Sequence, residues 1–225
     1  MIDLKTLNCK LFNGLSDDEF KLIELNSNLR VFDFNNGENV FVAGDEPEFL
    51  FVLIEGSVTI EKTDINGKRT IVNTFTNRGT VFGEVYLYLR ERSYDYTCHS
   101  IQASKVLAIP KEFIISLRTE DFESYSIIVQ NMLEILSEKA FHLNQKLLIH
   151  SSFSLRQKIS NYLLQVSGNS DIIKLVFNRE ELAQYIGTTR PSLSRELMNM
   201  EEENIISVDK DTIHILNRDY LEGII

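Results

Sequence analysis

The distribution of glycine divides this chain into regions that must fold differently. Six of the ten glycines fall at positions 37, 44, 56, 67, 79 and 83. From residue 121 to residue 150, by contrast, the chain has neither glycine nor proline. Because glycine supplies the positive φ angles of tight turns and weakens the interior of a helix, the first region is typical of closely spaced strands. The second region is typical of one long helix.

The glycine-rich region contains short runs of β-branched and aromatic residues between its turns. The expected strands are Val40–Ala43, Leu50–Ile54, Ser57–Lys62, Thr70–Phe75, Val81–Phe82, Tyr94–Ser100 and Lys105–Pro110. Turn signals recur at intervals of about 7–12 residues, and Asn66-Gly67 is a strong hairpin signal. This pattern predicts an all-β sandwich or barrel. The spacing alone does not choose among antiparallel barrels.

A short helix is expected around Phe113–Leu117, and the long glycine-free helix follows it. This long helix carries apolar residues at intervals of 4, 3, 4, 3 and 4: Val129, Leu133, Leu136, Ala140, Leu143 and Leu147. Heptad spacing predicts a coiled-coil seam, here a homodimer interface. The alternative is a helix buried against its own barrel. A second apolar stripe favours both contacts, on different faces: Ile128, Met132, Ile135 and Phe141.

The third region begins where serines at 151, 152 and 154 interrupt the helical pattern, as in a hinge. An amphipathic segment, Leu155–Val166, follows and ends near Gly168. Residues 151–225 contain 8 Lys+Arg and 11 Asp+Glu, which gives 8 − 11 = −3. Any attraction of this region for DNA must therefore come from one face.

The most informative stretch of the third region is NREELAQYIGTTRPSLSRELMNM, residues 178–200. Asn178 and Glu181 form a plausible capping pair for a short helix over Arg179–Ile186. Gly187 follows where that helix ends and the chain needs a left-handed turn. Thr188 or Thr189 can then cap a second helix, whose first turn tolerates a proline.

The spacing of these elements is that of a helix-turn-helix. A small residue, Ala183, precedes Gly187 by four positions, and Leu193 follows the glycine by six. The second helix would enter the DNA major groove with its N-terminal end. Its segment 190–195 has two arginines and no acid, on a chain of net charge −10. The predicted DNA-binding residues are Thr189, Arg190, Pro191, Ser192, Ser194 and Arg195.

Two further segments, Ile205–Val208 and Thr212–Leu216, flank a short turn and predict a β-hairpin wing. A helix–glycine–helix pair by itself is also a common packing corner. The wing after it, and the barrel and heptad helix before it, favour the DNA-binding interpretation.

Taken in order, these motifs resemble the Crp/Fnr family of bacterial transcription regulators. The resemblance rests on the barrel glycines, Gly79-Thr-Val-Phe-Gly83-Glu84, the long helix and FNREELAQYIGTTRPSLSREL. It implies an α+β chain with a cyclic-nucleotide-binding-like β-roll, a jelly-roll barrel, over residues 1–120. A dimerisation helix over 121–150 and a C-terminal winged helix-turn-helix over 151–225 would follow.

The resemblance also implies that Arg190, Ser194 and Arg195 occupy base- or phosphate-contacting positions. The partners would be a double-stranded operator with inverted-repeat symmetry, a second copy of the chain and RNA polymerase, reached through exposed loops. The operator sequence, the effector and the direction of regulation have no readable code in the residues.

The effector pocket departs from the family's cAMP-binding pattern, in which Gly-Glu is followed by an Arg-Ser pair that holds the cyclic phosphate. An ungapped alignment after Gly83-Glu84 places Tyr94 and Asp95 at the Arg-Ser positions. Asp95 would set a negative charge against the phosphate, so we expect no cAMP binding and leave the effector open. The alternative is a regulator that responds to a cyclic nucleotide or other small anion through Arg92-Ser93. The candidate effector pocket is Gly83, Glu84, Arg92, Ser93 and Tyr94.

Cofactor chemistry is disfavoured by the residue inventory. Two cysteines, Cys9 and Cys98, cannot supply four thiolates to an iron–sulfur cluster. We expect Cys98 and His99 to be ordinary strand residues and not haem ligands. The four histidines are scattered without a His-x-His pair, so we expect no metal site. We therefore expect a regulator and no enzyme.

Two other classes stay open at this point: a metal-dependent β-barrel enzyme with an accessory helical domain, and an interaction module whose C-terminal helices bind protein.

No apolar run approaches the roughly 18–20 residues that span a bilayer, and charges interrupt the N-terminal segment. We therefore expect a cytoplasmic protein with no membrane partner.

Overall fold

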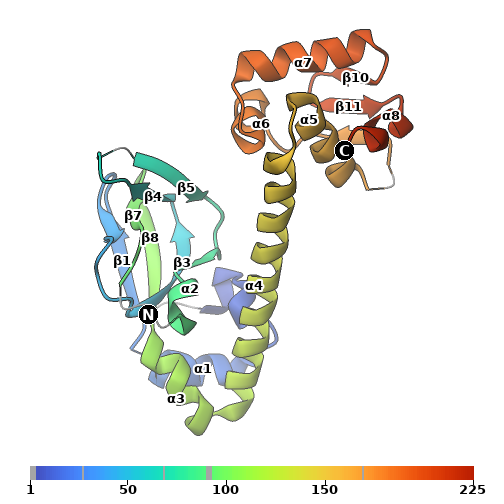
Figure 1. Cartoon of the computed structure of the whole chain (residues 1–225). Coiled ribbons are helices and arrows are strands. Elements are labelled where there is room, and N and C mark those ends of the chain that lie inside the picture. Colours follow the sequence, from blue (N-terminus) through green and yellow to red (C-terminus); the bar gives the residue numbers. More distant parts are fainter. Residues whose placement is uncertain (1–3, 27, 68, 90–92, 169) are drawn as a thin grey trace. The chain divides into compact units, whose positions relative to one another are not determined.

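The computed structural model describes residues 4–26, 28–67, 69–89, 93–168 and 170–225 (Figure 1). The chain forms two compact units, Met1–Leu136 and Ser137–Ile225. The long helix α4, Phe122–Ser151, contributes to both of them. Among the described helices, none is long and apolar enough to cross a membrane.

The N-terminal unit contains two four-stranded antiparallel sheets. The first has the order β1 (Arg30–Phe34), β8 (Ser104–Pro110), β3 (Phe49–Glu55), β6 (Val81–Phe82). The second has the order β2 (Asn39–Phe41), β7 (Thr97–Ser100), β4 (Val58–Thr63), β5 (Arg69–Phe75). The predicted strands are confirmed, but the predicted barrel does not close. Within the described residues, strands β1, β6, β2 and β5 remain edges, because none of them pairs with a strand of the other sheet.

Strand β3 is buried on both faces, which explains its uninterrupted apolar sequence. Leu50 and Val52 point to the core shared with the helices. Phe51 and Leu53 alternate with them and point to the space between the sheets. The neighbouring strand β8 divides its residues in the same way, so this pair of strands separates two hydrophobic cores.

The helices of the N-terminal unit cover the outer face of the first sheet. They are η1 (Leu4–Leu7), η2 (Lys10–Phe12), α1 (Asp17–Asn26), α3 (Lys111–Glu120) and the first half of α4. The short helix α2 (Val85–Tyr88) packs instead on the core between the sheets, through Tyr86. Helices α1 and α3 lie beside the beginning of α4 (Figure 1). The amide of Asn131 on α4 donates to the carbonyl oxygens of Leu11, at 3.0 Å, and Asn13, at 2.7 Å.

Helix α4 packs on the N-terminal core through part of the predicted second stripe. Ile128, Met132 and Ile135 are buried there, which confirms the contact of the helix with its own domain. Phe141, the fourth member of the stripe, is exposed instead. The reason is that the N-terminal unit ends at Leu136, so Phe141 lies beyond that core.

The C-terminal unit surrounds a separate hydrophobic core. Its elements after α4 are α5 (Leu155–Ser167), β9 (Ile172–Lys174), α6 (Arg179–Ile186), α7 (Arg190–Glu202), β10 (Ile206–Asp209), β11 (Thr212–Ile215) and α8 (Arg218–Gly223). The three strands form an antiparallel sheet in the order β10-β11-β9. Helix α7 runs along one side of this unit, next to β10 (Figure 1).

Candidate nucleic-acid interface

Helix α6 begins with a complete capping box. The side-chain oxygen of Asn178 accepts hydrogen bonds from the backbone N–H groups of Glu180, at 2.9 Å, and Glu181, at 3.0 Å. In return, the carboxylate of Glu181 accepts from the backbone N–H of Asn178 at 2.8 Å. The predicted capping pair is therefore confirmed, and it fixes where the first helix starts.

The turn between α6 and α7 requires glycine for two reasons. Gly187 has a φ angle of +78°, a conformation that side chains disfavour. A Cβ atom at this position would also lie 2.6 Å from Cε1 of His150, at the end of α4. That ring is held by its Nε2, which donates to the carbonyl oxygen of Tyr185 at 3.0 Å. The sharp turn thus depends on a close contact with α4.

Helix α7 is capped by Thr189, one of the two predicted candidates. The Oγ1 atom of Thr189 accepts from the backbone N–H of Ser192 at 3.3 Å, and its hydroxyl donates to Oγ of Ser192 at 2.9 Å. Pro191 lies in the first turn of the helix, where its missing N–H has no intrahelical partner to lose. The start of α7 is consequently well defined.

The two faces of α7 differ sharply. Leu193, Leu197 and Met200 are buried in the C-terminal core. On the other side, Thr189, Arg190, Pro191, Ser192 and Arg195 are exposed and Ser194 is half-buried. Neither Arg190 nor Arg195 forms an ion pair with another described residue. The predicted contact residues therefore share one free, positively charged end of a helix.

Arg156 on α5 pairs with two acids of α7 and its C-cap, Glu196 and Glu203. Its Nε atom lies 2.6 Å from Oε1 of Glu196, and its two terminal nitrogens lie 2.6 and 2.7 Å from the carboxylate of Glu203. The same guanidinium donates to the hydroxyl of Tyr220 at 3.1 Å. This hydrogen bonding lowers the pKa of Glu203 and raises that of Arg156. The clamp fixes α7 and compensates two of its negative charges.

The predicted wing forms from β10 and β11, which pair from Ile206–Ile215 to Asp209–Thr212. Lys210 makes the turn with a positive φ angle of 51°. The third strand of this sheet, β9, was not predicted; its three residues pair with β11. The side chain of Arg218 holds the segment before β9. Its guanidinium donates to Oδ1 of Asp171 at 3.0 Å and to the carbonyl oxygen of Ser170 at 2.8 Å.

In the candidate effector region, Tyr94 is part of an aromatic cluster. Its ring is 4% exposed, stacks on Phe41 at 4.0 Å between centroids and meets Tyr86 edge-on at 4.9 Å. Burial raises the pKa of Tyr94. Glu84 is also buried, and Ser93 is half-buried. Arg92 lies outside the described residues.

The cluster continues across the space between the two sheets. Phe41 on β2 stacks on Phe51 at 5.7 Å, Phe51 on Phe82 at 5.3 Å, and Phe82 on Phe75 at 5.6 Å. Gly83, directly after Phe82, has a φ angle of +77°, and a Cβ there would lie 3.1 Å from the ring of Phe51. The chain's own rings therefore pack against the backbone of the candidate effector pocket.

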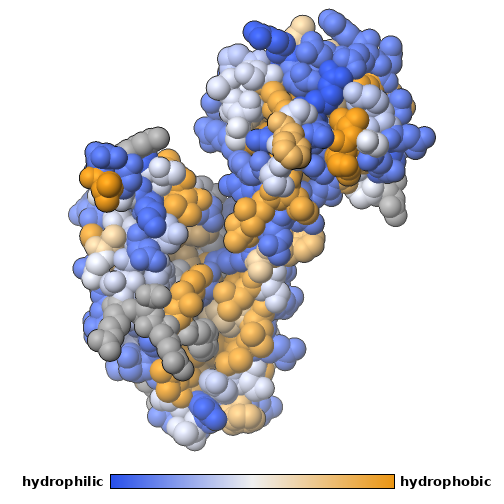
Figure 2. All heavy atoms as spheres, viewed as in Figure 1, coloured by the Kyte–Doolittle hydropathy of each residue, from blue (hydrophilic) through white to orange (hydrophobic). Residues whose placement is uncertain are grey.

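The predicted seam of α4 is largely exposed within one chain. Leu133, Leu143 and Leu147 are 60%, 59% and 58% exposed, and Ala140 is exposed as well. Val129 and Leu136, nearer the N-terminal core, are half-buried. Hydrophobic side chains are visible along α4 in the space-filling view (Figure 2). An exposed apolar line of this length is typical of an interaction surface.

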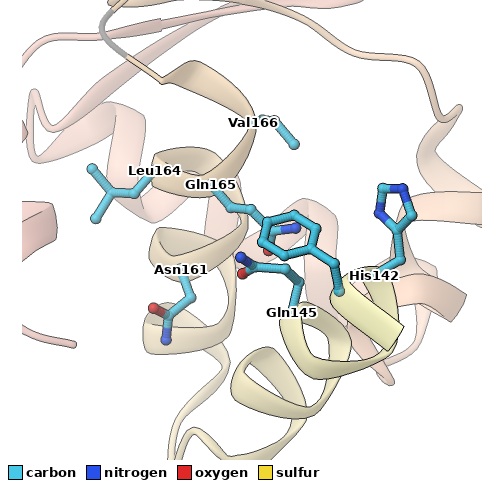
Figure 3. A pocket seen from close by; sticks show the side chains of 7 residues that line it. His142, Gln145, Asn161, Leu164, Gln165 and Val166 are labelled. Atoms are coloured by element: carbon cyan, nitrogen blue, oxygen red, sulfur yellow. The ribbon is translucent and has the colours of Figure 1, made fainter. Parts of the chain in front are cut away.

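A groove of about 490 Å³ lies between the second half of α4 and α5. Its walls are Phe141, His142, Gln145, Asn161, Leu164, Gln165 and Val166. The amide side chains of Gln145 and Gln165 lie close together between the two helices (Figure 3). Because the described residues of its walls include no lysine or arginine, they offer no fixed cation to a cyclic phosphate.

Comparison with known proteins places both units in known domain families. Residues 31–121 match the cyclic nucleotide-binding domain, and residues 157–224 match the Crp-like helix-turn-helix domain. The chain is 24% identical over 217 residues to the cyclic AMP receptor protein of Thermus thermophilus, which covers 95% of each sequence. It is 23% identical over 198 residues to the global nitrogen regulator of Synechococcus elongatus, covering 84% of this chain and 86% of that one.

Solved structures show the same fold. The catabolite activator protein of Thermus thermophilus has a TM-score of 0.52 at 23% identity and covers 96% of this chain and 97% of its own. The c-di-GMP responsive global regulator CLP of Xanthomonas campestris has a TM-score of 0.55 at 18% identity, with coverages of 83% and 93%.

The molecule is thus a DNA-binding transcription regulator, in which a cyclic-nucleotide-binding-type domain precedes a winged helix-turn-helix. The chain belongs to the Crp/Fnr family, as its sequence motifs predicted.

Proposed function

We propose that this regulator acts as a homodimer that places α7 of each protomer in the major groove of an inverted-repeat operator. The observation that carries this proposal is the free basic end of α7. Two arginines that pair with no other described residue stand on a unit of net negative charge, and Arg156 holds two of the nearby acids, Glu196 and Glu203. Local positive charge of this kind attracts phosphate even when the whole domain is acidic.

The two arginines have different roles in this proposal. Arg195 lies more than a turn into α7 and reads a guanine, because a guanidinium can donate to O6 and N7 together. Arg190, at the first position of the helix, contacts phosphate, together with the hydroxyls of Thr189, Ser192 and Ser194. Pro191, the second residue of α7, stabilises the first turn of the helix. Arg195 then carries sequence preference and Arg190 carries affinity.

The seam on α4 joins the two protomers. A second copy of the chain fits it, because an identical heptad line is self-complementary about a twofold axis. The exposed Leu143 and Leu147 support this arrangement, since a partner protomer would bury them. A twofold dimer of helix-turn-helix units requires half-sites about one DNA turn apart, roughly 10 base pairs.

For the effector region we propose that cAMP is not the ligand. The position expected for the phosphate-binding arginine is occupied by Tyr94, whose ring is stacked inside the domain. The second candidate, a response to a cyclic nucleotide or another small anion, is favoured by the buried Glu84 and by named relatives such as the cAMP-activated global transcriptional regulator CRP of Escherichia coli O157:H7. That candidate depends on Arg92 and Ser93.

We further propose that the chain has no catalytic activity and holds no metal or other cofactor. As a regulator of chromosomal genes it would act in the cytoplasm, where RNA polymerase is the partner that its exposed loops would meet.

Selection of bound duplexes from a random pool tests the proposed function. The full-length protein should enrich one inverted repeat, with the same half-site and spacing in the presence and absence of 1 mM cAMP, a concentration about a thousandfold above a micromolar dissociation constant. Enrichment of no sequence would contradict the proposal. Enrichment only with cAMP would replace the effector proposal with the second candidate.

A further inference from the structure

One apolar side chain stands in the middle of the polar face of α7. Met198 is 60% exposed, whereas the other methionine of this helix, Met200, is fully buried. Its neighbours on the exposed face are Ser194, four residues earlier, and Arg195, three residues earlier. A methionine placed there adds nothing to the core of the C-terminal unit.

Helical periodicity aligns Met198 with the proposed DNA contacts. Residues three and four positions apart lie on one side of a helix, so Pro191, Ser194 or Arg195, and Met198 follow each other along the exposed side. The buried residues, Leu193 and Leu197, occupy the opposite side. A helix that places Arg195 at a base edge therefore also turns Met198 toward the DNA.

The next residue on this line, Glu202, marks the limit of the DNA-facing surface. It is exposed and negatively charged, so the phosphates would repel it if α7 stayed parallel to the groove along its whole length. Met198 is consequently the last side chain of α7 that we place against a base.

The chemistry of Met198 restricts what it can contact. A thioether donates no hydrogen bond, but its flexible apolar chain adapts to small hydrophobic groups. In the major groove, the C5-methyl group of thymine is the apolar feature that distinguishes one base pair from the others. The rise from Arg195 to Met198, three residues of about 1.5 Å each, corresponds to about one base-pair step.

We infer that Met198 packs on the methyl group of a thymine next to the base pair read by Arg195, and that it sets a preference for thymine there. This inference rests on the proposed function, because it needs α7 in the major groove. It adds a specificity determinant that acts by shape and hydrophobic contact, without hydrogen bonds.

Deoxyuridine substitution tests the inference, since deoxyuridine lacks only the methyl group. In the operator obtained by selection, each thymine of both strands is replaced in turn, symmetrically in the two half-sites. Loss of one buried methyl should weaken binding about fourfold per half-site. The wild-type protein should show this loss at one thymine per half-site, and Met198→Ala should bind both duplexes equally. Met198→Leu, which keeps an apolar chain, should retain the wild-type response.

Val166→Ala is the matched control, because it also shortens an exposed apolar residue of the C-terminal unit but lies on α5. It should respond to deoxyuridine as the wild type does. If Met198→Ala keeps the full deoxyuridine effect, or if no thymine methyl matters to the wild type, the inference is wrong. Failure of the proposed function would appear earlier and separately, as the absence of any selected operator.

Discussion

The residues that were expected to face a ligand are exposed in the C-terminal unit and buried in the N-terminal unit. In the C-terminal unit, Arg190 and Arg195 are exposed at the end of a capped helix. In the N-terminal unit, Tyr94, at the expected phosphate position, is stacked on Phe41 in the interior. The DNA-facing end of α7 is thus open to a ligand, whereas the candidate effector pocket is packed with side chains of the chain itself.

The difference follows from the local packing of each unit. On α7, a helical period sends Leu193, Leu197 and Met200 inward and leaves the opposite face for other uses. In the β-roll, alternate strand residues must point between the sheets, and here they include the large rings of Phe41, Phe51 and Phe82. Membership of a domain family therefore determines the backbone fold. The side chains between the two sheets determine which ligands the domain can bind.

The largest effect that we predict concerns the seam of α4. Leu143→Asp with Leu147→Asp should convert dimers to monomers, because burial of each leucine contributes about 1.5–3 kcal/mol and the dimer contains four of these side chains. The loss of at least about 6 kcal/mol should raise the dimer dissociation constant by about four orders of magnitude. Light scattering combined with size-exclusion chromatography measures it.

Phe141→Asp with Leu148→Asp is the matched control, since these residues are 59% and 61% exposed on the same helix but lie off the seam. This variant should remain dimeric. A dimeric seam variant, or a monomeric control, would show that the protomers meet along a different line.

The second prediction tests whether the turn of the helix-turn-helix depends on α4. Gly187→Ala should destabilise the protein by about 2 kcal/mol or more, because it combines a left-handed backbone cost of about 1–2 kcal/mol with the contact to His150. In a His150→Ala background only the backbone cost should remain. Urea denaturation measures both values.

Gly168→Ala serves as the control for this cycle. Gly168 also has a positive φ angle, of 52°, but a Cβ there would meet no atom of the other described residues within 4 Å. Its cost should be unchanged by His150→Ala. Equal costs of Gly187→Ala in both backgrounds would mean that the contact with α4 contributes nothing.

The third prediction separates charge compensation on α7 from stability. Arg156→Gln should reduce the free energy of unfolding by about 1–2 kcal/mol through the loss of its partly buried pair with Glu196. It should also weaken operator binding, because Glu196 and Glu203 would then repel phosphate. Arg218→Gln, which breaks contacts away from α7, should reduce stability while leaving the operator affinity intact.

The same clamp makes stability depend on pH in a defined direction. Arg156 holds the pKa of Glu203 below its usual 4.5. The folded state therefore binds this proton less readily than the unfolded state, and the contribution of the pair is present above pH 4.5 and lost as the pH falls further. Arg156→Gln should have a flatter stability profile below pH 4.5; an unchanged profile would show that the clamp does not form in solution.

The last prediction is that the protein does not bind cAMP. Titration calorimetry of the full-length protein at millimolar cAMP should show no heat of binding, because the stacked Tyr94 replaces the phosphate-binding cation. A micromolar dissociation constant that Arg92→Ala abolishes would contradict this and would establish the Arg92-Ser93 alternative.

The sequence predicted the helix-turn-helix most completely because its signals are local. Asn178, Gly187 and Thr189 each act through the backbone within a few residues, so their positions in the chain are sufficient. The three-residue strand β9 has no such signal: it exists because β11 offers it an edge. Likewise β1 was missed, since most of its residues are exposed and it is defined by pairing with β8.

The sites were predicted unevenly for a similar reason. Helical spacing was enough to place Arg190 and Arg195 on one exposed face. The clamp on α7 was not predictable, because Arg156 meets Glu196 and Glu203 across 40 and 47 residues of sequence. The aromatic cluster around Tyr94 also joins strands that are distant in the chain. Alignment to the cAMP-binding pattern could therefore show only that Tyr94 replaces the expected arginine, and not that its ring is buried.

The account depends most directly on the assignment of α7 as the DNA reader, and competition binding against single-base variants of the selected operator measures it. Arg195→Ala should lose discrimination at one base pair in each half-site, by about 1–3 kcal/mol, and keep it at the others. Arg190→Ala should weaken all variants alike and reduce the salt dependence by about one unit per helix. An Arg195→Ala protein that discriminates at every position as the wild type does would contradict the assignment.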